Sequence, residues 1–243
     1  MLPRARLIGL LVTVFLIAGS AAAKPLVLNN TAEPPLTEAN GTGFLDRLAQ
    51  EAFRRAGVEL QLVKLPAERG LRNANAGIED GDLNRIAGIE RAFPNLVRVP
   101  EKNMDMDFSA FTRRPGLPTV TWQQLTTHRV GIIKGWKILE VNLKNARLIL
   151  NTNDAKQLYR VLERDRVDVV LYSKLMGLNH LRRHGPRDAI VLEPPLETRE
   201  MFMYLHKQHA ALVPRLAAAL RALKEDGTYD RFYRESITLK VAP

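Results

Sequence analysis

Two patterns of apolar residues, one typical of helices and one typical of strands, alternate along the chain. Apolar positions three and four apart, typical of a helix, cover residues 44–56 and 154–163. Short apolar or alternating runs, typical of strands, cover residues 25–29, 58–65 and 167–172. Similar patterns predict strands over 85–89, 108–112, 129–133, 190–192 and 201–205, and helices over 68–76, 138–143, 175–183 and 210–225. This alternation of strands and helices predicts an α/β protein.

The N-terminal segment, residues 1–23, has the pattern of a secretory signal peptide. Arg4 and Arg6 precede an apolar run over residues 7–17, and the small residues Ala21 and Ala23 end the segment. The run is shorter than the roughly 20 residues that span a membrane. An uncleaved N-terminal anchor or a buried helix remain the alternatives. Such a segment would direct the chain out of the cytoplasm, and cleavage after Ala23 would release the remainder, beginning at Lys24.

The composition narrows the classes of function. The chain of 243 residues has no Cys, so an exported form is held together by packing without disulfides. Its net charge is +10, or +8 after removal of Arg4 and Arg6 with the signal segment, and its Lys/Arg runs are at most pairs. We therefore expect no nucleic-acid partner. Two interpretations of the basic surface remain. It could favour a small anionic ligand, or it could bind lipid or wall polymers with an affinity that falls steeply with salt.

Signatures of catalysis and metal binding are sparse. The chain has no G-x-S-x-G, H-E-x-x-H or phosphate-loop pattern. His180 and His184 have a spacing that can bind a metal from one helix face, but Gly185 follows at once and Arg182 and Arg183 lie between them. The sequence therefore predicts surface histidines, no metal site and no cofactor.

Seven short motifs nevertheless occur in a fixed order. They are Gly43-Phe44-Leu45; Arg69-Gly70-Leu71 before Gly77-x-x-Asp80-Gly81; Gly88-Ile89-Glu90-Arg91; Phe108-Ser109-Ala110-Phe111; Val130-Gly131 with Lys134-Gly135; Val167-Asp168-Val169; and Asp226-Gly227-Thr228-Tyr229. This order resembles the periplasmic solute-binding proteins of ABC importers, in particular the amino-acid-binding branch known as family 3. The resemblance spans nearly all of the chain after the signal segment.

The resemblance implies a type-2 periplasmic binding protein, with two α/β lobes, a two-stranded hinge and a ligand cleft between the lobes. Lobe 1 would comprise residues 24–112 plus 200–243, and lobe 2 would comprise residues 113–199. Strands at 108–112 and 196–203 would cross between them. Such a protein is expected to be a periplasmic monomer that passes its ligand to a membrane permease or a sensor receptor.

The resemblance also assigns candidate ligand-binding residues. In this family an Arg of lobe 1 binds the ligand carboxylate with its planar guanidinium, and Arg91 stands at that position. Arg69 and Arg85 are further lobe 1 candidates. On lobe 2 the turn at Lys134 and Gly135 leads into a helix N-terminus, which could bind an anion.

Trp136 follows this turn and could form an apolar wall over the ligand or simply pack. Family members carry a carboxylate at the end of the lobe 2 strand, which binds the ligand ammonium. Counted from Asp168, which we expect to brace the strand, this chain has Tyr172 and Ser173 there. Glu33 or Glu38 could substitute. Together with the three arginines of lobe 1, the departure favours an anionic, carboxylate-bearing ligand, such as an organic acid or an acidic peptide fragment, over a standard amino acid.

An enzyme on the same fold is the alternative function. At least one exported dehydratase, resembling cyclohexadienyl dehydratase, shares this architecture, and a fold does not determine an activity. Its candidate acid–base residues here are Glu33, Glu90 and His128, and no two of them form a recognisable pair. The sequence therefore predicts a binding protein without catalytic residues.

Overall fold

The computed structural model describes residues 24–117 and 120–238, so the predicted signal peptide lies outside the described residues. Within this part, nine strands form one sheet in the order β2-β1-β3-β9-β4-β7-β5-β6, with β8 paired to β4. The strands are β1 (Leu26–Asn29), β2 (Leu60–Val63), β3 (Gly81–Ile86), β4 (Leu96–Thr112), β5 (Arg129–Ile133), β6 (Leu148–Thr152), β7 (Val169–Ser173), β8 (Ile190–Val191) and β9 (Glu197–His206).

Helices cover the sheet in two groups. They are α1 (Phe44–Arg55), α2 (Ala67–Ala76), α3 (Trp122–Leu125), α4 (Lys137–Asn142), α5 (Ala155–Glu163), α6 (Lys174–His184), α7 (Val213–Glu225) and α8 (Thr228–Tyr233). Short 3₁₀ turns cover Ile89–Arg91 and Lys207–Leu212, and a π turn covers Arg234–Thr238. No helix among the described residues is long and apolar enough to cross a membrane.

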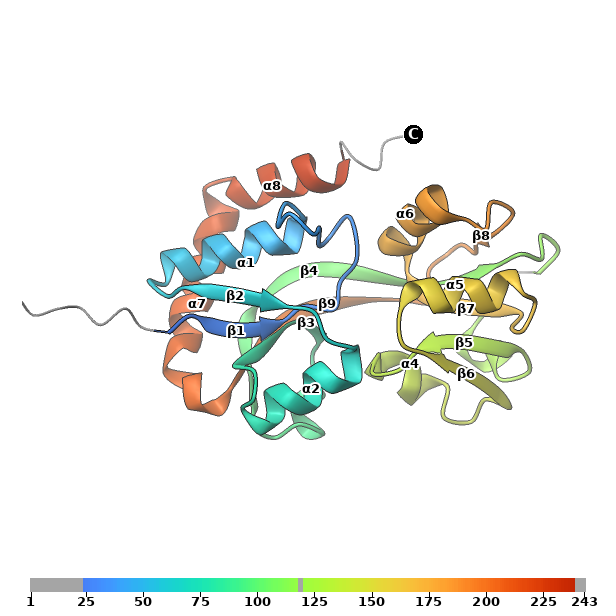
Figure 1. The fold of residues 1–243 in the computed structure, drawn as a ribbon, viewed down its shortest axis with the longest axis horizontal. Coiled ribbons are helices and arrows are strands. Elements are labelled where there is room, and N and C mark those ends of the chain that lie inside the picture. The colour runs from blue at the N-terminus through green and yellow to red at the C-terminus, as the bar shows by residue number, and fades with distance from the viewer. Residues whose placement is uncertain (1–23, 118–119, 239–243) are drawn as a thin grey trace, which may run out of the picture.

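Figure 1 shows two lobes joined by the long strands β4 and β9. Lobe 1 holds β1–β3 with α1, α2, α7 and α8, and lobe 2 holds α3–α6 with β5–β8. β4 pairs with β9 over most of its length and then with β7 and β8, so it belongs to both lobes. The expected α/β class and two-lobed architecture are confirmed. The residue boundaries of the lobes and the hinge role of β4 and β9 stay predictions.

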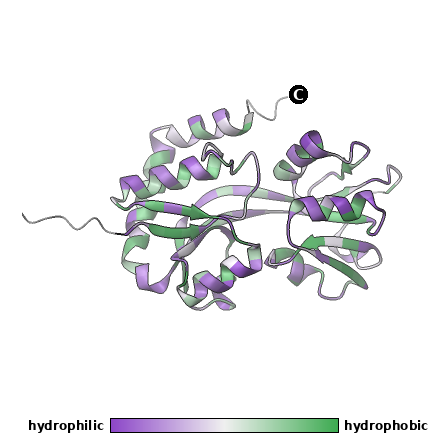
Figure 2. Cartoon of the chain, viewed as in Figure 1, coloured by the Kyte–Doolittle hydropathy of each residue, from purple (hydrophilic) through white to green (hydrophobic). Residues whose placement is uncertain are grey.

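Local sequence explains why these elements form. In α1 the apolar spacing places Phe44, Leu48 and Ala52 on the buried face, and Asp46 accepts a hydrogen bond from the backbone of Gly43 at the N-terminus. In α5 the carboxylate of Asp154 caps the first turn by accepting from the Gln157 N–H at 2.7 Å. Figure 2 shows the same pattern, with largely hydrophobic strands and helices that alternate between hydrophobic and hydrophilic residues.

Three strands differ from their sequence prediction. β3 starts at Gly81, before the predicted segment 85–89, because buried polar residues such as Asp82 interrupt the apolar pattern. β4 has 17 residues, far more than the predicted 108–112, because charged residues such as Asp105 occupy its exposed positions. β6 lies at the sheet edge and was not predicted. Tertiary pairing overrides a weak local pattern in each case.

Candidate functional site

A small cavity lies where the two lobes meet, and we name it the inner cavity. Its volume is about 40 Å³, room for about three water molecules. Both lobes and both crossing strands contribute to its wall. The lining residues are Thr31, Ala32, Asn84, Arg85, Ile86, Ile89, Met106, Phe108, Gly135, Trp136, Lys137, Ile138, Met176 and Met201.

Apolar side chains dominate the inner cavity. Met106 and Phe108 line it from β4, Met201 from β9 and Met176 from α6. Methionine is flexible and adapts to the shape of what it contacts. No Asp or Glu is among the lining residues. The wall therefore suits a ligand with an apolar body and offers a cationic group no carboxylate partner.

Arg85 supplies the buried guanidinium of the inner cavity. Its Nε and Nη2 donate to the two carboxylate oxygens of Asp82, both at 2.8 Å, and Nη2 also donates to the Ala67 carbonyl at 3.0 Å. Nη1 makes only a long bond, 3.5 Å, to the carbonyl of Gly135 on lobe 2. The bidentate face of Arg85 is thus used within lobe 1, and Nη1 is the donor left for an acceptor in the cleft.

A second cavity of about 200 Å³, the outer cavity, adjoins the first. Thr31 and Trp136 line both cavities. The Trp136 ring lies 4.9 Å from the Tyr172 ring and 5.8 Å from the Phe108 ring, between centroids. Trp136 therefore packs in the cleft and also forms part of its wall.

The lobes contact each other directly across the cleft. Lys137 of α4 forms an ion pair with Glu68 of α2 at 2.6 Å and a second with Glu140 at 2.8 Å. Burial opposes the charge of Lys137, but the hydrogen bonds to Glu140 and Glu68 outweigh this and raise its pKa. Asn179 of α6 also donates to the Pro34 carbonyl at 3.0 Å. We call this arrangement, with the lobes in direct contact, the closed form.

The cleft lining contains some of the predicted site residues. Arg85, Gly135 and Trp136 line the inner cavity, and Glu33 and Tyr172 line the outer one with Trp136. The Glu33 carboxylate forms an ion pair with Lys64 at 2.7 Å, which reduces its availability for a ligand ammonium.

Other predicted site residues lie apart from this lining. Arg69 and Arg91 are exposed, Arg91 in a 3₁₀ turn, and Lys134 is exposed beside the cleft. Ser173 is buried and caps α6 by accepting from the Met176 N–H. The backbone N–H of Gly135 donates to Glu140 at 2.6 Å, so that group is already bonded.

Several lining residues were missed from the sequence. Asn84 lines the inner cavity, and its Oδ1 accepts from Asn103 at 3.1 Å. Met106 and Phe108 alternate on one face of β4, and the short predicted strand did not include Met106. If the sequence prediction had included all of β4, the spacing of two between Met106 and Phe108 would have indicated that both side chains lie on the same face of the strand.

The candidate acid–base residues of the enzyme alternative lie on separate elements. Glu33 belongs to the loop after β1, Glu90 accepts from the Tyr204 hydroxyl at 2.9 Å, and His128 directly precedes β5. Among the described residues, no group of three or more His, Cys, Asp or Glu could hold a metal. Asp168 braces the start of β7 as expected, accepting from the Arg129 N–H at 2.9 Å.

Comparisons by sequence found little. No protein-family model matches the chain. A protein of Shewanella oneidensis described as uncharacterized is 25% identical over 193 residues, which cover 76% of this chain and 72% of that protein.

Solved structures show much stronger likeness in fold than in sequence. A mutant of ArgBP from T. maritima matches with a TM-score of 0.76 at 18% identity, over 88% of this chain and 95% of its own. An amino acid ABC transporter substrate-binding protein from Streptococcus pneumoniae, bound to L-arginine, matches at 0.75 and 17%, over 90% and 97%. A histidine kinase sensor domain with similarity to periplasmic binding proteins matches at 0.79 and 15%, over 89% and 97%. The chain therefore has the two-lobed fold of the type-2 periplasmic binding proteins.

Proposed function

We propose that this protein is an exported solute-binding protein that captures a small carboxylate-bearing ligand between its lobes. The observation that carries the proposal is the inner cavity, which is formed by both lobes and by the two strands that join them. Small ligands commonly bind at such interfaces, and hinge closure around them needs few broken contacts. The protein acts by binding, without catalysis, cofactor or metal.

The cleft chemistry favours an anion that lacks an ammonium group. The Nη1 of Arg85 and the side-chain amide of Asn84 supply hydrogen-bond donors in a wall without carboxylates. An α-ammonium buried there would have no charge partner, which is costly. The apolar lining suits the body of such an organic acid.

The closed form would be presented to a membrane partner in the periplasm. The structural neighbours support both kinds of partner, since they include a protein of an amino acid ABC transporter and a histidine kinase sensor domain. We propose an importer permease or a sensor receptor as the partner of a monomer, with no nucleic acid involved.

Binding of matched ligand pairs tests the ligand class. Trp122→Phe leaves Trp136 as the fluorescent reporter in the cleft, and it is titrated with 2-oxo acids and with amino acids of the same side chain. We expect the oxo acids to bind about tenfold tighter or more, on the scale of one uncompensated buried charge. If every amino acid bound more tightly than its matching 2-oxo acid, the anionic ligand class would be contradicted, but the proposal that the cleft binds a solute would still hold.

Two substitutions test the residues. Asn84→Asp retains the side-chain size but adds a negative charge, so it should weaken binding of the acids by at least about tenfold. Arg91→Ala tests the role that the family resemblance assigns to Arg91, which lies apart from the cleft lining; a loss of about 1.5–3 kcal/mol would support that role. Unchanged affinity in Arg91→Ala would remove Arg91 from the site, and no response to any solute in any variant would contradict the proposed function. Native mass spectrometry of protein from its own compartment would identify the bound molecule.

A further inference from the structure

The positive charge of the molecule resides on one lobe. Lobe 2, over positions 113–199, contains sixteen Lys and Arg against eight Asp and Glu, a net charge of +8. Lobe 1, over positions 24–112 and 200–243, contains eighteen of each kind, a net charge of zero. The net charge of the chain after the signal segment is thus carried by lobe 2, and this asymmetry gives the molecule a preferred orientation toward an anionic surface.

Within lobe 2, several chain turns converge at the end of the sheet opposite the cleft. Arg129 at the start of β5 pairs with Leu148 at the start of β6, and Thr112 at the end of β4 pairs with Ile190 of β8. The Thr112 hydroxyl donates to the carbonyl of Asp168, directly before β7. We name this end the distal tip, and it comprises residues 112–114, 126–129, 143–148, 164–168 and 187–190. β5 then runs away from the tip toward the cleft, so the two regions are separate (Figure 1).

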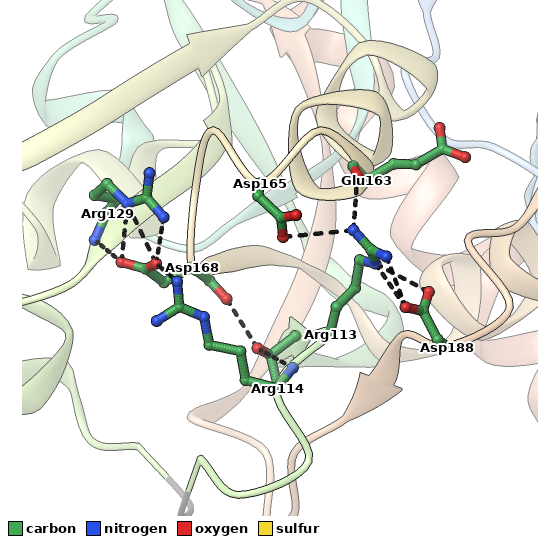
Figure 3. A network of polar contacts seen from close by, with 8 residues as sticks. Arg113, Arg114, Arg129, Glu163, Asp165, Asp168 and Asp188 are labelled. Carbon is green, nitrogen blue, oxygen red and sulfur yellow. Dashed lines mark hydrogen bonds and ion pairs between the residues drawn. The ribbon is translucent and has the colours of Figure 1, made fainter.

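The carboxylates of the distal tip are all engaged in ion pairs. Arg113 binds Asp165 at 3.4 Å and Asp188 at 2.8 Å, while Arg114 and Arg129 bind Asp168 at 2.5 and 2.7 Å (Figure 3). Hydrogen bonds from Arg129 lower the pKa of Asp168 to about 2, so it stays charged and paired. The charges of these three arginines are therefore paired with carboxylates of the distal tip itself.

Five further cations at the distal tip have no such partner. Their side chains are exposed and make no ion pair or hydrogen bond with any residue that the structure describes. They lie on three turns at the same end of the sheet, before β6, β7 and β8, and Glu163 at the end of α5 adds one carboxylate. The five are Lys144, Arg147, Arg164, Arg166 and Arg187.

Exposed aliphatic side chains lie among these cations. Among the described residues, six large hydrophobic side chains are clearly exposed, and two of the six belong to the distal tip. They are Leu148 at 49% and Ile190 at 41% exposure. A basic surface that only contacts water does not require exposed aliphatic side chains. If the partner were a highly charged polymer, these side chains would remain in contact with water after binding.

We infer that the distal tip of lobe 2 binds the surface of an anionic phospholipid bilayer. Unpaired Lys and Arg side chains bind headgroup phosphates, and aliphatic side chains insert at the boundary between headgroups and acyl chains. Because the tip is at the opposite end of the lobe 2 strands from the cleft, ligand entry and lobe closure stay unobstructed. The docked protein would remain close to a partner in the same membrane.

Vesicle flotation tests the inference with the full-length exported chain. Vesicles of phosphatidylcholine alone are compared with an equimolar mixture of phosphatidylcholine and phosphatidylglycerol, at low and at high salt. We expect binding to the anionic vesicles only, weakened by salt as surface charges are screened. The double variant Lys144→Glu/Arg147→Glu should lower this binding by at least about tenfold, since each surface cation contributes to bilayer affinity.

A matched control has the same change in net charge on lobe 1. Lys207→Glu/Arg234→Glu also reverses two exposed cations without an ion pair among the described residues, and it should stay within about twofold of the unmodified protein if position matters. Equal losses in both double variants would overturn the inference, because net charge alone would then explain binding.

Leu148→Ser separates a bilayer from other polyanions. If Leu148 inserts into the bilayer, Leu148→Ser should bind vesicles more weakly than the unmodified protein. This difference should persist at high salt, where the electrostatic part of binding is screened. Unchanged vesicle binding in Leu148→Ser would overturn insertion and indicate a purely electrostatic partner, such as an acidic protein surface. Binding of a cleft ligand, measured by Trp136 fluorescence, should be unchanged in all of these variants, so the test is independent of the proposed function.

Discussion

At the scale of single residues, Gly135 sets how closely the two lobes approach. Its φ of 92° lies in the left-handed region, where residues other than Gly are strained by roughly 1–2 kcal/mol. A Cβ at this position would also overlap with the backbone of Ala67 and Glu68 on the opposite lobe. The closed cleft therefore requires glycine for conformation and for space.

Gly135→Ala should consequently shift the molecule toward an open form. The clash is with backbone across the cleft, so lobe separation relieves it more easily than local adjustment. We expect a larger radius of gyration by small-angle X-ray scattering and an affinity for cleft ligands reduced by about tenfold or more. Gly88→Ala is the matched control, because Gly88 has a φ of 90° and no atom within 4 Å of a new Cβ. An equal effect of both substitutions would contradict the steric account.

The arginines show what the sequence could predict at this scale. The resemblance placed Arg91, Arg69 and Arg85 on lobe 1, but only Arg85 is among the residues that line the inner cavity. Arg85 lies there because Asp82, on the same strand, binds its guanidinium and orients it. Both side chains of this pair are buried, which motif order does not report.

At the scale of elements, an aromatic stack joins α5 to α6 in lobe 2. The rings of Tyr159 and His180 lie 4.5 Å apart and nearly parallel, at 16°. Burial and the neighbouring His184 lower the pKa of His180 to about 4, against an opposing effect of Asp154. The two histidines predicted as surface residues thus differ, because His180 is half-buried and His184 is exposed.

This stack predicts a pH dependence of stability. The unfolded chain takes up a proton on His180 below about pH 6.5, whereas the folded chain does so only near pH 4. Stability is therefore full above pH 6.5 and falls as the pH drops toward 4. Since the ring is half-exposed, the full shift is reduced and about 1 kcal/mol of this loss is expected from His180.

Denaturant unfolding at pH 7 and pH 4.5 measures the effect. His180→Phe retains the stack but cannot titrate, so it should remove about 1 kcal/mol of the stability difference between the two pH values. His128→Phe, on a histidine with no ring contact among the described residues, should leave that difference unchanged. A difference unaltered in His180→Phe would show that other groups account for acid sensitivity.

Element prediction succeeded where local periodicity and burial coincide. α1, α5 and α7 show clear helical spacing and were found near their observed bounds. β4 was found only from Phe108 onward, although Met104, Met106 and Phe108 already alternate with charged residues. The part before Met104 pairs with β9 through register shifts. Long-range pairing stabilises that part, and no short window of sequence contains it.

At the scale of the whole molecule, an ion pair between the lobes stabilises the closed form. Lys137 and Glu68 are both largely buried, with exposed side-chain fractions of 23% and 18%. Burial opposes the charge of Glu68, but the hydrogen bonds from Lys137 and Arg72 outweigh it and lower its pKa. Arg72 lies on α2 with Glu68, so only the contact to Lys137 crosses the cleft.

Lys137→Met should therefore open the empty molecule. A partly buried pair contributes about 1 kcal/mol, which corresponds to about a fivefold fall in the ratio of closed to open forms. Scattering without ligand measures the ratio, and Arg72→Met is the control that removes a partner of Glu68 within lobe 1. Equal opening in both variants would assign the effect to Glu68 solvation rather than to a contact between lobes.

The α/β class, most of the helices and the order of motifs that matches the two-lobed fold could all be inferred without a structure. These features follow from local periodicity and from residues close together in the chain. The three-dimensional fold was needed to show that Arg85, Asn84, Met106 and Met201 share one cavity, and that five exposed cations of lobe 2 without an ion pair among the described residues lie together at the distal tip. Both outcomes depend on strand register and lobe contact between residues far apart in sequence, because side chains converge through pairing that no local pattern encodes.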